Sequence, residues 1–135
     1  MLNPNVPVKK WFGGQVETLT SLPVYDGFAP DNAPAEYIVM DGRNGTQEQG
    51  ETGFTTPVVI ILDITTKSAN FGYKRAEEIS SDIMAGINSD TVVNLDSGFE
   101  ASSLVIDSIR NLDGLNPMDN VFRVLLTYNL IVTQP

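Results

Sequence analysis

The closing segment VFRVLLTYNLIVTQP (121–135) constrains the fold more than any other part of the chain. Every second residue in it is apolar: Phe122, Val124, Leu126, Tyr128, Leu130 and Val132. A period of two places these side chains on one face of a β-strand. Such a strand would run about 40 Å at roughly 3.3 Å per residue, which exceeds what one short helix covers. We therefore expect the last hairpin to extend past the domain body or to lie against something else.

A second strand is predicted at Thr56–Lys67, TPVVIILDITTK. One of its faces is wholly apolar: Val58, Ile60, Leu62 and Ile64. The other face begins with Val59 and Ile61 and then turns polar at Asp63 and Thr65. A sheet face that is only half apolar often meets a neighbouring copy of the protein.

One segment, 70–88, has the period of an amphipathic helix. Its apolar residues form a single stripe: Tyr73, Ala76, Ile79, Ile83 and Ile87. Ser68 or Asn70 is a candidate cap at the start, and Asn88 is a candidate end. A sheet is the only predicted element large enough to bury this stripe.

The remaining segments are short. Residues 1–22 are predicted to be irregular or helical, with a helix at Lys9–Leu19 that Gly13 and Gly14 weaken by about 1 kcal/mol each. Further strands are expected at 24–30, 37–40, 91–99 and 103–112, with a turn at Asp41-Gly42.

The element order predicts one α+β domain over residues 1–135. Its sheet is mostly antiparallel, one main amphipathic helix packs on one face, and β-hairpin arms protrude.

Composition narrows the function classes. The 135 residues include no cysteine and no histidine, so the commonest general base and the commonest ligands of transition metals are missing. The net charge of −9 gives no basic surface that would attract nucleic acid, and no apolar run is long enough to span a membrane. The N-terminus lacks the apolar stretch of a signal peptide, so we expect an intracellular start.

No pattern of catalytic or metal-binding residues is evident. Glu78 and Asp82 are spaced to share a helix face, but solvated charges on most helices have that spacing. The acidic loops lack the spacing of a calcium site. We therefore predict no enzyme activity and neither catalytic residue, cofactor nor metal.

The glycine-rich segment MDGRNGTQEQGETGFTT (40–56) raises a choice between a phosphate loop and a flexible arm. Gly45 and Gly50 have the spacing of a P-loop, but Glu51-Thr52 stands where Lys-Ser/Thr is required. A strand rather than a helix follows. We therefore predict a flexible hairpin loop over 41–56 that neighbouring subunits order.

Residues of this loop are candidates for a subunit interface: Gly45, Gln47, Gln49 and Phe54. Trp11 and Phe12, beside two lysines, are also candidates. Either they anchor an interface, or they cap an edge of the sheet; the sequence favours neither.

The order and spacing of several motifs resemble the tail terminator, or tail completion, proteins of long-tailed bacteriophages. The pieces are VYDGFAP (24–30), PAEYIVM (34–40), VVIILDITTKS (58–68), RAEEISSDIMAGI (75–87), VVNLDSGF (92–99) and FRVLLTYNLIVT (122–133). They cover about residues 22–133. One departure is the N-terminus, which is shorter and richer in glycine and proline than the long first helix of many members.

This resemblance implies an α+β subunit without catalytic residues that assembles as a homohexameric ring. The ring would sit on the finished tail tube, stop its growth and join it to the head connector. Its partners would be other copies, the tube protein and the connector, with DNA passing through unbound and no membrane involved. Its location would be the virion tail or neck, and the host cytoplasm during assembly.

Two other function classes stay open. One is another phage neck or head-completion protein, which the resemblance also allows, or a soluble binding module or adaptor, which would stay monomeric or dimeric. The other is a small hydrolase that uses carboxylates and a metal, which the absence of histidine and cysteine disfavours.

Overall fold

The computed structural model describes residues 3–50, 53–67, 72–96, 98–112 and 121–134. Its elements are, in chain order, α1 (Asn5–Thr20), β1 (Val24–Asp26), β2 (Glu36–Asn44), β3 (Glu48–Gly50), β4 (Gly53–Lys67), α2 (Lys74–Gly86), β5 (Glu100–Leu112) and β6 (Val121–Gln134). The strands form one sheet in the order β1-β2-β4-β6-β5, with β3 paired to β4 at one end. All pairs are antiparallel except β1 with β2. The predicted α+β class is confirmed.

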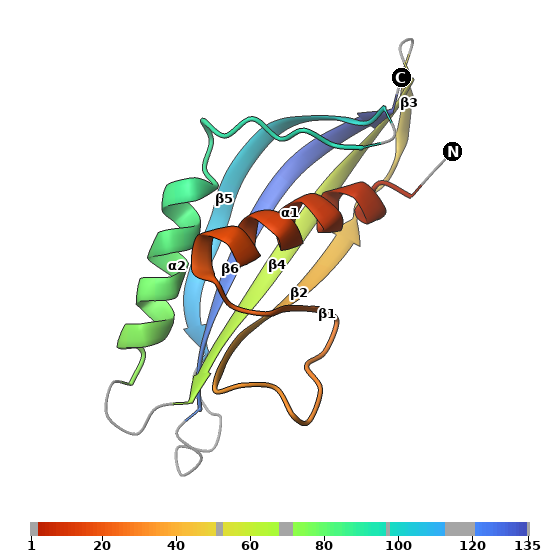
Figure 1. Cartoon of the computed structure of the whole chain (residues 1–135). Helices are drawn as coiled ribbons and strands as arrows, with labels where there is room; N and C mark the ends of the chain where they lie inside the picture. The colour runs from red at the N-terminus through yellow and green to blue at the C-terminus, as the bar shows by residue number, and fades with distance from the viewer. Residues whose placement is uncertain (1–2, 51–52, 68–71, 97, 113–120, 135) are drawn as a thin grey trace.

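The centre of the sheet is the antiparallel pair β4–β6, in register from Phe54↔Gln134 to Lys67↔Val121. The predicted apolar faces of these strands point together into the core, where their side chains are almost fully buried: Val58, Ile60, Leu62, Ile64, Val124, Leu126, Tyr128, Leu130 and Val132. Both helices lie over this one face (Figure 1). At one end the β3–β4 hairpin projects beyond the start of α1 (Figure 1).

The predicted helix stripe on α2 faces the sheet. Ala76, Ile79, Ile83 and Ile87 are each at most 1% exposed, and Tyr73 packs at the edge of the core. The amide of Asn88 donates to the carbonyl of Ala85 at 3.2 Å, just beyond the last helical residue, which agrees with its predicted place at the helix end. The cap candidates Ser68 and Asn70 lie outside the described residues.

The first helix is longer than the predicted Lys9–Leu19 and runs straight through Gly13 and Gly14. It is held by its packing: Val8, Phe12 and Val16 are fully buried against the sheet. Burial of three apolar side chains offsets the low helix propensity of two glycines.

The predicted turn at Asp41-Gly42 is wrong, because β2 continues through it to Asn44. Instead, the missing side chain of Gly42 allows α1 to lie close to the sheet. A Cβ atom there would lie 2.8 Å from Cε of Lys9 and 3.2 Å from Oδ1 of Asn5. The Asn5 amide also donates to the Gly42 carbonyl at 3.2 Å. A glycine that reads locally as a turn signal therefore allows a helix to cross the strand.

The strand predicted at 91–99 is also wrong. In the described part of that segment the only ladder contact is an isolated bridge between Asn94 and Glu100. The segment instead runs as an extended loop over the core, where Val93 and Leu95 pack against buried side chains and Phe99 is 5% exposed. Its alternating apolar residues serve packing without a strand partner.

The helix stripe yields a stability test. Replacing Ile83 with alanine should lower the free energy of unfolding by about 2–5 kcal/mol, because a fully buried side chain would leave a cavity. Total stabilities of such domains are about 5–15 kcal/mol, so the melting temperature should fall clearly. The exposed Ser81→Ala on the same helix is the control and should change stability by less than about 0.5 kcal/mol. Equal melting temperatures for the two variants would contradict the packing described here.

Candidate interaction surfaces

The arm, defined as residues 45–50 and 53–57, is built from β3 and the beginning of β4. Its register is Glu48↔Thr55, Gln49↔Phe54 and Gly50↔Gly53. Most of the segment predicted as a flexible loop over 41–56 is therefore paired backbone, with strand residues in β2, β3 and β4. The reason is that the long β4–β6 ladder continues beneath it and offers β4 as a template for pairing.

Gly45 has a structural role within its own subunit. Its N–H donates to the Pro57 carbonyl at 2.7 Å, and a Cβ atom on it would lie only 2.6 Å from Cγ of Pro57. The glycine therefore lets the base of the arm close tightly on β4. Of the other predicted arm residues, Gln47 and Gln49 are exposed, and Phe54 is half-buried. Gln47 donates to the Thr56 hydroxyl at 3.4 Å.

The two aromatic candidates on α1 differ in accessibility. Phe12 is fully buried and contacts the Tyr128 ring at 5.3 Å between centroids, so its prediction as an interface residue is corrected: it belongs to the core. Tyr128 donates its hydroxyl to the Ile87 carbonyl at 2.7 Å, and burial raises the pKa of Tyr128 above its ordinary value. The phenol therefore stays protonated as a donor.

Trp11 is half-buried at the surface, edge-on to Phe12 at 5.0 Å. It lines a shallow depression of about 230 Å³ between α1 and the loop that contains Asp96. The Lys10 ammonium lies 2.6 Å from the Asp96 carboxylate at this place, and that hydrogen bond raises the pKa of Lys10. Trp11 thus packs against Phe12 within its own subunit, and the rest of its side chain remains accessible in the depression.

The sheet face opposite the helices is called here the open face, because both helices lie on the other side. Strand alternation and register assign to it an aliphatic band along the central strands, and these side chains are half-buried or exposed: Val39, Val59, Val105, Ile61, Leu125 and Ile131. The predicted polar continuation of β4 follows at Asp63 and Thr65. The face is therefore apolar enough to bury against protein, yet polar at one end.

An ion pair between Arg123 and Asp63 lies on the open face. Arg123 Nε donates to Asp63 Oδ1 at 3.0 Å and to Asp63 Oδ2 at 3.1 Å, and a second guanidinium nitrogen also contacts this carboxylate. Both side chains are mostly buried, at 29% and 18% exposure. The carboxylate raises the pKa of Arg123. A fork-shaped pair of this kind fixes geometry more than it adds stability.

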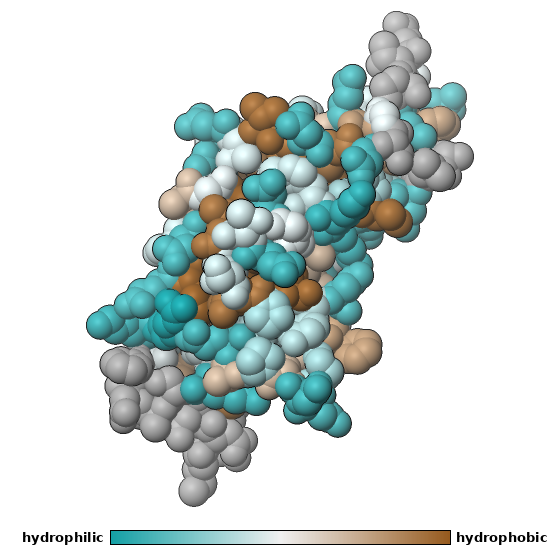
Figure 2. Space-filling model, viewed as in Figure 1, coloured by the Kyte–Doolittle hydropathy of each residue, from teal (hydrophilic) through white to brown (hydrophobic). Residues whose placement is uncertain are grey.

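The charges of the open face balance. Alternation and register assign four carboxylates and four cations to it: Asp41, Glu48, Asp63, Glu100, Arg43, Lys67, Arg110 and Arg123. Because the whole chain carries a net charge of −9, the excess of acidic residues lies elsewhere. The helix-bearing side is largely hydrophilic, with smaller hydrophobic areas (Figure 2). The face best suited to burial is therefore also the neutral one.

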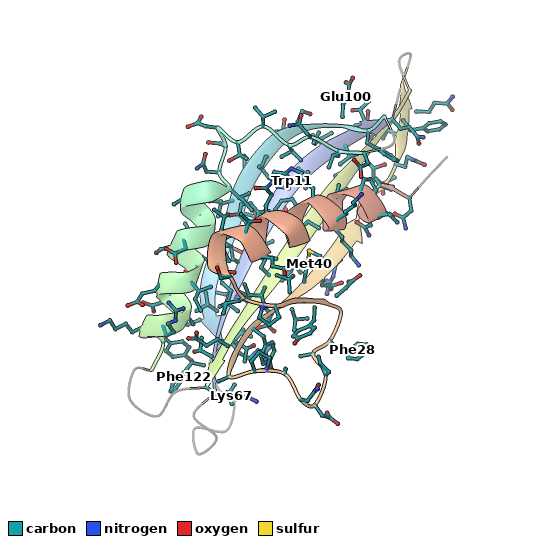
Figure 3. The ribbon with its side chains drawn as sticks, viewed as in Figure 1. Trp11, Phe28, Met40, Lys67, Glu100 and Phe122 are labelled. Atoms are coloured by element: carbon teal, nitrogen blue, oxygen red, sulfur yellow. The ribbon has the colours of Figure 1, made fainter. Side chains whose placement is uncertain are left out.

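A hollow lies at the β1 edge of the open face and is called here the β1 hollow. It measures about 340 Å³ and is lined by Gly27, Phe28, Ala29, Tyr37, Val39, Asp63, Thr65, Val121 and Arg123. Phe28 is 78% exposed, and its ring stands away from the ribbon (Figure 3). Sequence reasoning missed Phe28. Its signal is an aromatic residue placed between Gly27 and Pro30 in a turn-rich segment that offers no core position.

Among the described residues, no group of three or more His, Cys, Asp or Glu side chains is placed to hold a metal ion. Within the same ranges, no helix is long and apolar enough to cross a membrane.

No protein-family model and no curated protein matches the chain. Among solved structures, the fold matches a protein chain in the virion of a native gene transfer agent (GTA) particle. The TM-score is 0.77, with 14% sequence identity over 98% of this chain and 99% of that chain. The two chains share a fold. The match extends over nearly all of both chains.

The arm yields a second test. Gly45→Ala should lower the free energy of unfolding by about 1–3 kcal/mol, because the new methyl group would overlap the Pro57 ring. Gly50→Ala is the matched control in the same arm, since a Cβ atom there meets its nearest neighbour at an ordinary 3.7 Å. Thermal unfolding of both variants measures the difference. A Gly45→Ala variant as stable as Gly50→Ala would mean that the base of the arm is not closed as described.

Proposed function

We propose that this chain is a structural virion protein that forms a ring at the end of a phage tail tube, terminates tube growth and joins the tail to the head connector. The observation that carries the proposal is the fold, shared end to end with a chain of a GTA virion. The order of the motifs, which resembles that of tail terminator proteins, supports the specific role in tail termination and head joining. The partners would be other copies of the chain, the tube protein and the connector.

The surfaces are those of an assembly subunit. A neutral, half-apolar sheet face lies uncovered, and an arm projects past the helices (Figure 1). Large apolar side chains are also exposed at several separate places: Val6, Phe28, Val92, Val105, Ile109 and Ile131. A contiguous apolar band, such as that of the open face, is typical of proteins that bury it against partners. A ring satisfies several such surfaces at once, because each subunit meets two neighbours and the tube.

The net negative charge of the chain is compatible with a channel through which DNA passes. Because the open face is neutral, the excess carboxylates are available to other surfaces, including α2, where Glu77, Glu78 and Asp82 are exposed. An acidic channel repels the phosphate backbone and lets DNA slide without binding. We infer that the open face meets protein and that an acidic surface faces the DNA. No specific contact with DNA is needed in this role.

The ring is tested by electron microscopy and native mass spectrometry of the purified protein, alone and mixed with tail tubes. We expect a six-fold ring, in solution at high concentration or on tube ends. An adaptor in the neck would bind its partners as a monomer or dimer. If only monomers and dimers appear both in solution and on tubes, the proposed function is wrong.

The arm is tested by hydrogen exchange over residues 42–55 in the free subunit and in the assembly. We expect fast exchange at exposed arm amides in the free subunit and slower exchange in the ring. The physical reason is that, in the described part of the chain, β3 pairs with β4 alone, so the backbone groups on its outer edge are available to a neighbouring chain. The buried amides of α2 provide an internal control that should not change. Equal exchange rates across the arm in both states would show that the arm is not part of the subunit interface.

A further inference from the structure

The two edges of the sheet carry different apolar features. At one edge, β5 presents Val105, which is 45% exposed and lies on the open face because it pairs with Asn129. At the other edge lies the β1 hollow, with Phe28 at its rim. The strand order places β5 and β1 at opposite ends of the sheet, as Figure 1 also shows. On the open face, one edge therefore projects an apolar side chain, and the other offers a recess.

We propose that the β5 edge of one subunit docks into the β1 hollow of the next copy of the same chain. This contact is heterologous, because it joins two different surfaces. A heterologous contact closes into a ring when its rotation divides a full turn, whereas a contact of one surface with itself ends at a dimer. The inference rests on the proposed ring and identifies the surfaces that make it.

Charge complementarity supports the second copy as the occupant. Asp107 is exposed on the β5 edge, between Val105 and Ile109 in sequence, at an irregularity in the pairing with β6. Lys67 is exposed near the hollow, with its ammonium 6.0 Å from the centroid of the Tyr37 ring that lines it. Within the described ranges neither residue takes part in an ion pair. Each edge thus carries an exposed charge of opposite sign to the other.

The interior of the hollow accepts apolar side chains without leaving a charge unpaired. Its carboxylate, Asp63, and its guanidinium, Arg123, already bind each other. The rest of its lining is mainly apolar or aromatic. Burial of Val105 there would remove apolar area from water on both subunits, which is the main favourable term in association.

The irregular β5 edge disfavours the alternative of simple strand addition. The pairing of β5 with β6 shifts register between Ser102 and Val105 and again between Ile106 and Ser108, and Ser103 has a φ of 56°. Bulges of this kind interrupt the straight row of backbone groups that a further strand needs. Side chains rather than backbone ladders would therefore carry the contact.

The test exploits the absence of cysteine, which makes the chain a clean background for cross-linking. The double variant Ala29→Cys/Val105→Cys places one thiol in the hollow and one on the β5 edge, and a short bis-maleimide then links thiols that lie close. We expect a covalent ladder up to the full ring on a denaturing gel. Each single variant should give no product larger than a monomer, because the contact joins unlike surfaces.

The control double variant, Ala29→Cys/Val92→Cys, moves the second thiol to a side chain that is 75% exposed in the loop after α2. It should give no ladder. A parallel measurement compares Val105→Asp with Val92→Asp in the otherwise unchanged chain. The first should raise the protein concentration needed for half-maximal ring formation at least about tenfold, and the second should leave it unchanged. Circular dichroism of both variants checks that each is folded.

The outcomes separate this inference from the proposed function. Rings in native mass spectrometry together with a ladder specific to the Ala29/Val105 pair support both. Rings without that ladder, an equal ladder from the control pair, or dimers from a single-cysteine variant overturn the inference and leave the ring. If the unchanged chain forms no ring in solution or on tube ends, the proposed function fails, and this inference fails with it.

Discussion

The structure depends on the burial of one continuous apolar face of the β4–β6 pair beneath two helices. These strands stay in register from Phe54↔Gln134 to Lys67↔Val121, so their inward side chains form an unbroken hydrophobic surface. Strand alternation fixes this surface strictly, because a slip of one residue would turn every apolar side chain outward. α1 and α2 both pack on this surface, and they also contact each other where Gly86 meets Leu19.

The same pair of strands generates the features that we assign to assembly. Because β4 and β6 are longer than the helices can cover, their far end carries the arm beyond the domain body. Because the helices occupy only one side, the outward residues of the same strands form the open face. Its neutral charge and its Asp63–Arg123 pair suit burial against another protein rather than contact with nucleic acid. Fold and proposed function thus share one physical origin.

Several glycines have roles that local sequence rules do not reveal. Gly42 allows the start of α1 to cross β2, Gly45 lets the arm close on Pro57, and Gly86 packs against Leu19 where the two helices meet. In each place a Cβ atom would lie within 3.0 Å of another residue. The segment that reads as a flexible loop is therefore glycine-rich partly because its backbone is closely packed.

The sequence by itself determined the central strands, the α2 stripe and the mixed α+β class, because period-two and period-3.6 patterns report directly which side of an element is buried. It also indicated the half-apolar second face of β4. Only the tertiary structure decided that α1 passes through Gly13 and Gly14, that Gly42 lies within a strand, that residues 91–96 form a loop, and that Phe12 belongs to the core. Each of these depends on contacts between residues far apart in the chain, where packing outweighs the local preference of one or two residues. The β1 hollow and the β5 edge are of the same kind, since side chains from separate strands and loops meet there only after the sheet has formed.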